Sequence, residues 1–288
     1  MDISGLDALD RRISDCRACP RLVAWREEVA AVKRAAFADE TYWGRPVPGF
    51  GPPDARLLIV GLAPAAHGGN RTGRMFTGDR SGDVLYRALY DLGLASQPTA
   101  VGVGDGLELH GVRVTSPVHC VPPANRPTPG ERDTCRPWLV RELRLLRPTL
   151  RSVVVLGAFG WQAALPAFAE AGWTVPRPRP VFAHGARLPL SASGTTGETG
   201  APGTSGAPGA SGASGAHGAD EGIGVSGDRG EPDVREQPDG GVARPLELFG
   251  CFHVSQRNTF TGRLTPEMLR EVLRTAARVA GLTVAPEK

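Results

Sequence analysis

Short apolar runs alternate along the chain with segments of helical periodicity. The runs are rich in Val, Leu and Ile, as strands buried on both faces of a parallel sheet are. They cover residues 57–61, 112–115, 152–156 and 246–252. Helices between strands return the chain to the same end of a sheet, so the alternation predicts an α/β fold. We expect a three-layer α/β/α sandwich with a central four-stranded parallel sheet.

Helical segments are marked by apolar residues three or four positions apart and by capping residues. The segment 81–92 carries one apolar stripe, and Gly93 follows where a helix end is expected. Residues 128–131 (TPGE) form a helix start with the pattern of a capping box. Further helices are predicted at residues 5–34, with a break at the CRACP segment, at 159–171, and from Thr265 onward.

Three polar loops follow predicted strands directly. They cover residues 62–80, 116–126 and 253–263 and are rich in Gly, Asn, Arg and His. The carboxyl ends of parallel strands lie at one edge of the sheet, where open α/β folds place their chemistry. We therefore expect these three loops to meet and form one cleft.

Residues 191–242 differ in composition from the rest of the chain. Glycine occupies every third position from Gly194 to Gly218, which is the collagen period. Only two of these triplets contain proline, and the period stops after Asp220. We interpret 191–242 as a disordered, acidic Gly/Ser-rich insert in one domain formed by residues 1–190 and 243–288.

The charge of the chain is distributed unevenly. The insert carries eight acidic and two basic residues, a net charge of −6, so the total of +3 leaves about +9 on the remaining chain. A basic body suits a polyanion such as nucleic acid, although an arginine-rich source would give the same surplus. The acidic insert could compete with nucleic acid for this body, which its deletion would test.

Membrane insertion and secretion are not indicated by the sequence. No stretch approaches the roughly 18 apolar residues of a membrane helix. The segment MDISGLDALDRR lacks the basic and apolar regions of a signal peptide. We expect a cytoplasmic protein without a membrane partner.

Four of the five cysteines suggest a metal site. Cys16 and Cys19 form a C-x2-C pair, whereas Cys120 and Cys135 lie far away in the sequence. Disulfides are not expected with an odd count in the cytoplasm, and four thiolates suit zinc or an iron–sulfur cluster. A zinc ribbon would have a second C-x2-C, and unrelated buried thiols are a third interpretation. Cys251 lies in an apolar run and is expected to be a core residue.

Three segments together resemble the motifs of the uracil-DNA glycosylase superfamily, most closely its family 5, the iron–sulfur type. They are GLAPAAHGGNRTGRMFTGDRSG at 61–82, CVPPANRPTPGE at 120–131 and HVSQRNTFTGRLT at 253–265. The resemblance covers the chain outside 191–242. It implies hydrolysis of the N-glycosidic bond of uracil in double-stranded DNA, and of hypoxanthine, xanthine and other damaged bases, in base excision repair. It also implies a structural [4Fe–4S] cluster on Cys16, Cys19, Cys120 and Cys135. A monomer is expected, and a non-catalytic nucleic-acid-binding module of the same fold is the alternative.

The resemblance implies roles for two residues in particular. A glycosylase must flip its base out of the stack into a pocket, and Phe76 matches the family's stacking Phe. The departing base carries negative charge on a carbonyl oxygen, and His253 matches the catalytic His that stabilises it. Core packing of Phe76 and a structural role of His253 are the alternatives.

The residue that activates water must lie at another position than in most of the superfamily, because the sequence departs here from the usual pattern. Other families place an acid or Asn where this chain has Leu62 and Ala63, and family 5 shares the apolar version. Asp79 is the nearest acid in the loop and is our candidate, with an N-cap as its alternative. Asn125 is the candidate for holding the water or the base edge.

Further substrate contacts are predicted on all three loops. Ala63 lies in the first loop, and Ser116 replaces an Asn that related families use to read uracil, which fits a broader substrate range. His67 and Asn70, with Arg71, are expected to contact phosphate or shape the pocket. Arg257 and Asn258 are expected to enter the minor groove or fill the gap left by the flipped base.

Overall fold

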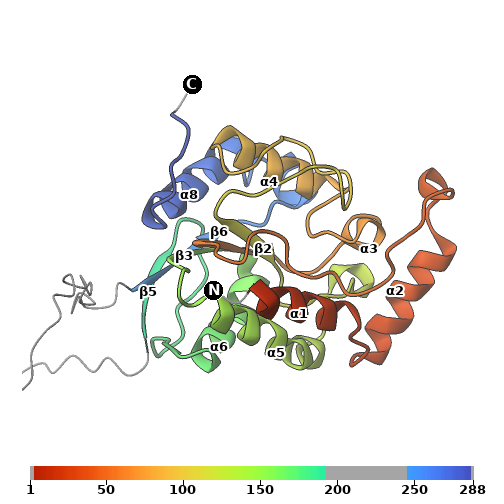
Figure 1. The fold of residues 1–288 in the computed structure, drawn as a ribbon, viewed down its shortest axis with the longest axis horizontal. Helices are drawn as coiled ribbons and strands as arrows, with labels where there is room; N and C mark the ends of the chain where they lie inside the picture. The colour runs from red at the N-terminus through yellow and green to blue at the C-terminus, as the bar shows by residue number, and fades with distance from the viewer. Residues whose placement is uncertain (1–2, 193–244, 287–288) are drawn as a thin grey trace, which may run out of the picture. The chain divides into compact units, whose positions relative to one another are not determined.

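The computed structural model describes residues 3–192 and 245–286. In this part of the chain, one sheet has six strands in the order β2-β1-β3-β6-β5-β4. Neighbours among β2, β1, β3 and β6 are parallel, while β5 is antiparallel to β6 and β4 to β5. Figure 1 shows the strands between helices. The strands are β1 (Leu57–Val60), β2 (Val112–Thr115), β3 (Ser152–Leu156), β4 (Trp173–Thr174), β5 (Arg187–Ala192) and β6 (Leu246–Cys251).

The four predicted parallel strands are confirmed, and the two antiparallel strands were not predicted. In β5 only Leu190 is buried, because the strand lies toward the edge of the sheet and leaves most of its side chains partly or fully exposed. Such a strand lacks the continuous apolar run that marks a central one. Ser191 and Ala192 belong to β5, and the other residues of the predicted insert lie outside the described residues.

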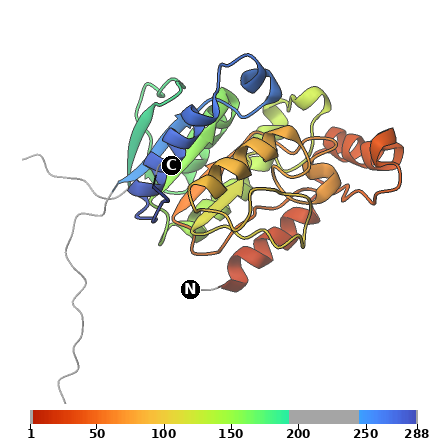
Figure 2. The ribbon, with the colours of Figure 1, turned by 90° about the horizontal axis from the view of Figure 1, so that it is seen from above.

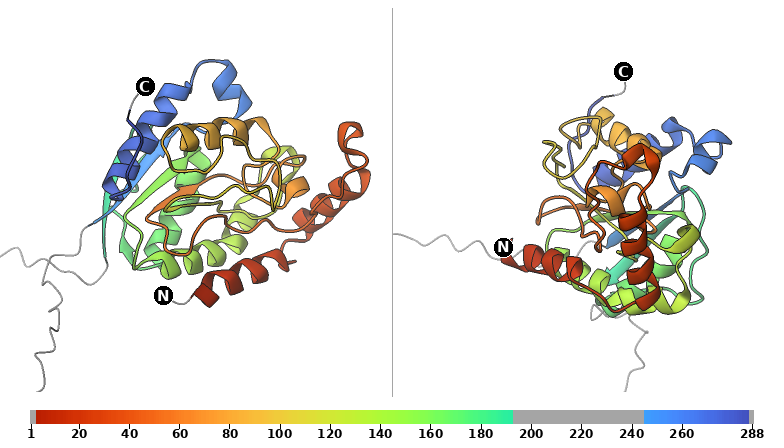
Figure 3. Two further views of the ribbon diagram at one scale, coloured as in Figure 1. Left: turned by 45° about the horizontal axis from the view of Figure 1, so that its top comes forward. Right: turned by 90° about the vertical axis from the view of Figure 1, so that its right-hand side faces the viewer.

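Helices cover both faces of the sheet, as predicted. Helices α1, α5 and α6 pack on Leu58 and Val60 of β1, and helices α4 and α8 pack on Leu57 and Ile59. Figures 2 and 3 show these two helical layers from other directions. The helices are α1 (Ile3–Ser14), α2 (Pro20–Val32), α3 (Gly69–Thr72), α4 (Arg80–Asp91), α5 (Pro129–Leu146), α6 (Gly157–Glu170), α7 (Gln256–Phe260) and α8 (Pro266–Val279), with 3-10 turns η1 (Ala35–Phe37) and η2 (Pro123–Asn125).

Helix α5 begins at the capping residue that the sequence predicts. Thr128 Oγ1 accepts from the Glu131 amide at 3.2 Å, and the Glu131 carboxylate accepts from the Thr128 amide at 2.7 Å, which completes the capping box. Each of the three polar loops also contains one short turn of helix, α3, η2 or α7. Among the described residues, we find no helix with the length and apolar character needed to cross a membrane.

A buried ionic cluster ties strand β2 to both helices beneath it. Arg113 of β2 is 3% exposed and binds Glu142 of α5 at 2.5 Å and Asp10 of α1 at 2.8 Å. Thr115 Oγ1 donates to the other Glu142 oxygen at 2.7 Å. Because Thr115 is the last residue of β2, this cluster fixes the position from which the second loop starts.

Candidate active site and cysteine cavity

Two of the three polar loops bring an aromatic ring and an imidazole together. The rings of Phe76, after β1, and His253, after β6, have centroids 6.0 Å apart and planes inclined by 34°. Gly157, which begins α6 after β3, lies against the His253 side chain, because a Cβ there would be 3.2 Å from His253 Cβ and 3.9 Å from the ring atoms Cγ and Cδ2. The predicted meeting of loops at the carboxyl edge is therefore confirmed for the first and third loops.

The position of Phe76 depends on two glycines that approach it closely. A Cβ on Gly61 would lie 2.7 Å from Phe76 Cζ, and a Cβ on Gly82 would lie 1.8 Å from the Phe76 carbonyl oxygen. Phe76 itself has φ of 51°, in the left-handed region that L-residues rarely adopt. Such strain persists only where the surroundings enforce it, and it is common at ligand sites.

The imidazole of His253 lies in a mostly buried environment. Burial lowers the pKa of His253 to about 4, so the ring is neutral at physiological pH. The Asn258 side-chain amide donates to the His253 carbonyl oxygen at 2.8 Å. Asn258 therefore holds the backbone that carries the imidazole, while its predicted contact with DNA stays a prediction.

Asp79 is the N-cap of helix α4. Its Oδ1 accepts from the Ser81 amide at 2.9 Å and from the Gly82 amide at 3.1 Å. Its other oxygen lies against Gly68 in the first loop, where a Cβ would come within 2.2 Å. Burial raises the pKa of the Asp79 carboxyl. The capping interpretation is confirmed, and the role in activating water stays a prediction.

The other predicted residues of the first loop contact the N-terminal segment or the cluster around the cysteines. His67 Nδ1 lies 2.9 Å from the Tyr42 hydroxyl oxygen. Asn70 is 1% exposed, and its side-chain amide donates to the Arg26 carbonyl oxygen at 3.1 Å. Ala63 packs against the cluster of Leu22, Val118, Cys120 and Cys135. These contacts give the three residues a structural role, and their contacts with substrate stay predictions.

The remaining predicted residues differ widely in exposure. Ser116 is 1% exposed, and its hydroxyl donates to the Val118 carbonyl oxygen at 2.8 Å. Asn125 is exposed and has φ of 55°, directly after Ala124 with φ of 52°. Arg257 is exposed on α7. Asn125 and Arg257 are thus accessible to a large substrate, whereas Ser116 is engaged by its own loop.

The four predicted ligand cysteines line one small cavity. Cys16, Cys19, Cys120 and Cys135 share it with Arg26. Within residues 3–192 and 245–286, no three His, Cys, Asp or Glu side chains are arranged so that they could hold a metal ion. The gathering of the four cysteines is as expected, and the group they hold stays a prediction. Cys251 is fully buried in the apolar core below α4 and α8, as predicted.

Two residues at these sites were missed by the sequence analysis. Arg26 is 2% exposed and lies in the wall of the cysteine cavity. Its spacing offers a signal, because it follows Leu22 by four positions and precedes Val29 by three, on the buried face of α2. Phe260 of α7 is 71% exposed, with the Arg80 guanidinium 5.7 Å from its ring centroid. Exposure of an aromatic residue at a helix end has no comparable signal.

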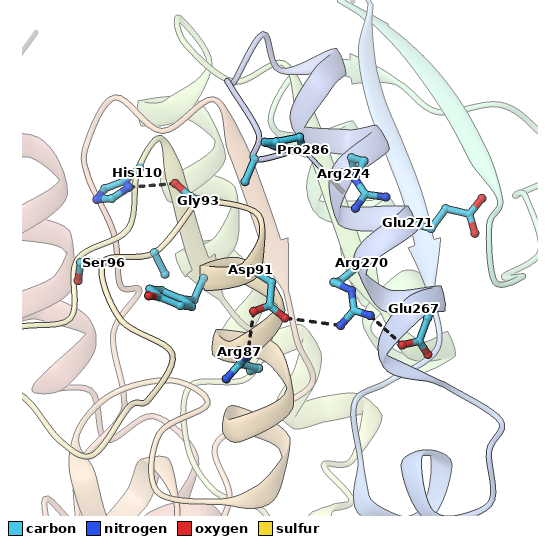
Figure 4. Close-up of a pocket in the computed structure, with 13 residues that line it drawn as sticks. Arg87, Asp91, Gly93, Ser96, His110, Glu267, Arg270, Glu271, Arg274 and Pro286 are labelled. Atoms are coloured by element: carbon cyan, nitrogen blue, oxygen red, sulfur yellow. Dashed lines mark hydrogen bonds and ion pairs between the residues drawn. The ribbon is translucent and has the colours of Figure 1, made fainter. Parts of the chain in front are cut away.

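A separate pocket of about 1000 Å³ lies between α4 and α8 and contains none of the predicted site residues. Figure 4 shows its charged wall, in which Asp91 pairs with Arg87 at 2.9 Å and with Arg270 at 3.5 Å. Arg270 also pairs with Glu267 at 2.7 Å. These charges are paired within the wall, so the pocket is not assigned to the site described above.

Comparison with known proteins gives two similarities that cover nearly the whole of this chain and a third that covers less than half of it. The family described as the uracil DNA glycosylase superfamily matches residues 48–277. The type-5 uracil-DNA glycosylase of Mycobacterium tuberculosis is 47% identical over 95% of this chain and 81% of the relative. The protein of the same name from Thermus thermophilus is 43% identical over 96% of this chain and 99% of the relative. A type-4 uracil-DNA glycosylase of Archaeoglobus fulgidus is 34% identical over only 40% of this chain and 50% of the relative.

Proposed function

The chain belongs to the uracil-DNA glycosylase superfamily and to its type 5, and on this basis we propose that it excises uracil from DNA by hydrolysing the N-glycosidic bond. The observation that carries the proposal is the approach of the Phe76 and His253 rings from two loops at the carboxyl edge of the sheet. An aromatic face and a hydrogen-bond donor are what a site for a flipped base requires.

The imidazole of His253 supports departure of the base. A base stacked on Phe76 lies beside this ring, whose pKa of about 4 keeps it neutral. A neutral imidazole can donate one N–H to the carbonyl oxygen on which negative charge develops. A positioned donor of this kind contributes roughly 10²- to 10³-fold in rate.

Water is activated by Asp79, by Asn125 or by both in this proposal. One Asp79 oxygen caps α4, and the other lies against Gly68 in the first loop. The carboxylate is thus held rigidly and can stabilise positive charge on the sugar as the bond breaks. Asn125 is exposed and held in a strained conformation, as residues at ligand sites often are.

The DNA backbone is bound by the basic surface of the domain. The chain outside 191–242 carries a charge of about +9, which suits a polyanion. Arg257 and Phe260 are both exposed on α7, close in sequence to His253. We propose that α7 faces the gap left by the flipped base, where Arg257 and Phe260 can enter.

A wider range of bases, including hypoxanthine and xanthine, is part of the proposal. Ser116 is smaller than Asn, and its hydroxyl is already bound to the Val118 carbonyl oxygen. It would therefore discriminate between base edges less strictly than an Asn at this position. We also propose that the protein excises these bases in base excision repair. It would act in the cytoplasm and as a monomer.

The four cysteines are proposed to hold a [4Fe–4S] cluster. The donor set is all sulfur, it lines one cavity, and a buried guanidinium donates to one of the sulfurs. These features fit an anionic iron–sulfur centre, with Cys16, Cys19, Cys120 and Cys135 as its ligands. Bound there, the group would fasten α2 to the second loop and α5. A broad absorbance near 400 nm, together with the iron and sulfide content of one [4Fe–4S] cluster per chain, would support the cluster. Bound zinc in place of iron and sulfide would refute it.

Cleavage of defined duplexes tests the activity. The protein is incubated with a duplex carrying one uracil, and alkali then breaks the strand at abasic sites. A break at the uracil position with wild type, but not with a uracil-free duplex, is the expected result. No break would refute the proposal and favour the non-catalytic module. The same assay with hypoxanthine, xanthine and ethenocytosine, in double and single strands, measures the substrate range.

A further inference from the structure

A buried arginine in the cysteine cavity lacks a close carboxylate partner. Arg26 is 2% exposed, and the carboxylate it reaches among the described residues is Glu27, at 3.9 Å and 45% exposed. The other arginines of this region are better matched, since Arg21 binds Glu131 at 2.7 Å and Arg17 binds Glu27. A guanidinium removed from water without a counter-charge is strongly destabilising, so Arg26 requires a negative partner.

The contacts of Arg26 point to the sulfur side of the cavity. Its Nη1 donates to Cys120 Sγ at 3.0 Å and to the Cys16 carbonyl oxygen at 3.0 Å. Its Nε is buried and has no hydrogen-bond partner in the described part of the chain. Hydrogen bonds from a cation to an anionic acceptor are stronger than those between neutral groups. A thiolate set carrying net negative charge would therefore supply the counter-charge that Arg26 lacks, at the sulfur to which Nη1 already donates.

We propose that Arg26 is the internal counter-ion of an anionic centre held by the four cysteines, and that it raises the reduction potential of that centre. The proposal rests on the cluster proposed above and identifies the residue that offsets its charge. Reduction adds one negative charge, which a guanidinium at hydrogen-bonding distance from a ligand sulfur stabilises.

The same residue connects the cysteine cavity to the first loop. The Arg26 carbonyl oxygen accepts from the Asn70 side chain at 3.1 Å, and Asn70 lies in α3, 1% exposed. The Asn70 carbonyl oxygen in turn accepts from the Gly44 amide at 3.0 Å. Arg26 is thus a positioning residue as well, because its backbone fixes α3 while its side chain faces the sulfurs.

A reduction-potential measurement on the loaded protein tests the charge of Arg26. The variants are Arg26→Met, which removes the charge with similar length, and Arg26→Lys, which keeps it. Arg21→Met is the matched control, since Arg21 is on the same helix but binds Glu131. We expect Arg26→Met to lower the reduction equilibrium constant at least tenfold, a shift of about 59 mV for one electron. Arg26→Lys and Arg21→Met should stay within about threefold of wild type, about 28 mV on the same scale.

The outcomes separate the counter-ion from a purely structural role and from failure of the cluster proposal. An unchanged potential in Arg26→Met, or equal shifts in Arg26→Met and Arg26→Lys, would overturn the counter-ion. If Arg26→Met assembles no cluster, retention of the cluster in Arg26→Lys supports the charge, and its loss there overturns it. An equal effect of Arg21→Met would mean that loosening of α2 is the cause. Absence of iron and of 400 nm absorbance in wild type would instead refute the cluster itself.

Discussion

Replacing Gly61 by Ala tests whether the position of the Phe76 ring controls excision. The added Cβ would lie 2.7 Å from Phe76 Cζ and 2.8 Å from Cε2. Carbon atoms in contact are optimally about 3.5–4.0 Å apart, so the ring must retreat by roughly 1 Å. The Phe76 backbone cannot easily follow, because its carbonyl oxygen is packed on Gly82. The substitution therefore tilts or displaces the ring on which the base would stack.

The expected loss of excision rate follows from the displacement of the Phe76 ring. A misplacement of about 1 Å in an active site can cost on the order of 10²-fold in rate, and stacking on an aromatic ring contributes about 1–3 kcal/mol. We expect the single-turnover excision rate of Gly61→Ala to fall by about 10- to 100-fold, which corresponds to roughly 1.4–2.7 kcal/mol. Affinity for undamaged DNA should be unchanged, because the substitution alters no charge.

Single-turnover cleavage of a uracil duplex by wild type, Gly61→Ala and Gly102→Ala measures the effect. Gly102 is the matched control, since a Cβ there would meet no atom within 4 Å. In a Phe76→Ala background, Gly61→Ala should lower the excision rate little further, because both changes act through the Phe76 ring. A Gly61→Ala rate within twofold of wild type, or a full additional loss in the Phe76→Ala background, would refute the reasoning.

Three further predictions concern His253 and Asp79. His253→Ala should lower the excision rate by about 10²- to 10³-fold while gel-shift affinity for DNA is retained, because a donor to the departing base is lost; parallel losses of rate and affinity would contradict this. Because burial lowers the pKa of His253 from 6.5 to about 4, the unfolded chain takes up this proton first as pH falls, and folded-state stability is lost between about pH 6.5 and 4. Urea unfolding of wild type should therefore lose up to about 2 kcal/mol more between pH 7 and 5 than that of His253→Asn, and equal losses would disprove the shift. Asp79→Asn should keep the cap and the unfolding free energy but lose excision rate, whereas Asp79→Ala should also lose about 1 kcal/mol of stability; a wild-type rate in Asp79→Asn would leave Asp79 as a cap only.

Local patterns along the chain determined the core of the fold and the edge at which the site forms. Apolar runs and helical spacing predicted the four parallel strands, and the capping box predicted the start of α5. These features are readable because each depends on residues a few positions apart. The meeting of Phe76 and His253 was predictable for a related reason, since the carboxyl ends of parallel strands share one edge.

Burial of polar residues was decided only by the tertiary structure. Asn70 and Ser116 lie in polar loops and were predicted to contact substrate, yet both are 1% exposed. The hydrogen bond from Asn70 to Arg26 joins residues 44 positions apart, and that from Arg26 to Cys120 joins residues 94 positions apart. Buried polar side chains are normally hydrogen-bonded, and the partners of Asn70 and Arg26 are so distant in the sequence that no periodic signal marks them. Strand β5 was missed because it is defined by its pairing with β6, which is distant in the sequence. Its own residues have too little apolar content to predict a strand.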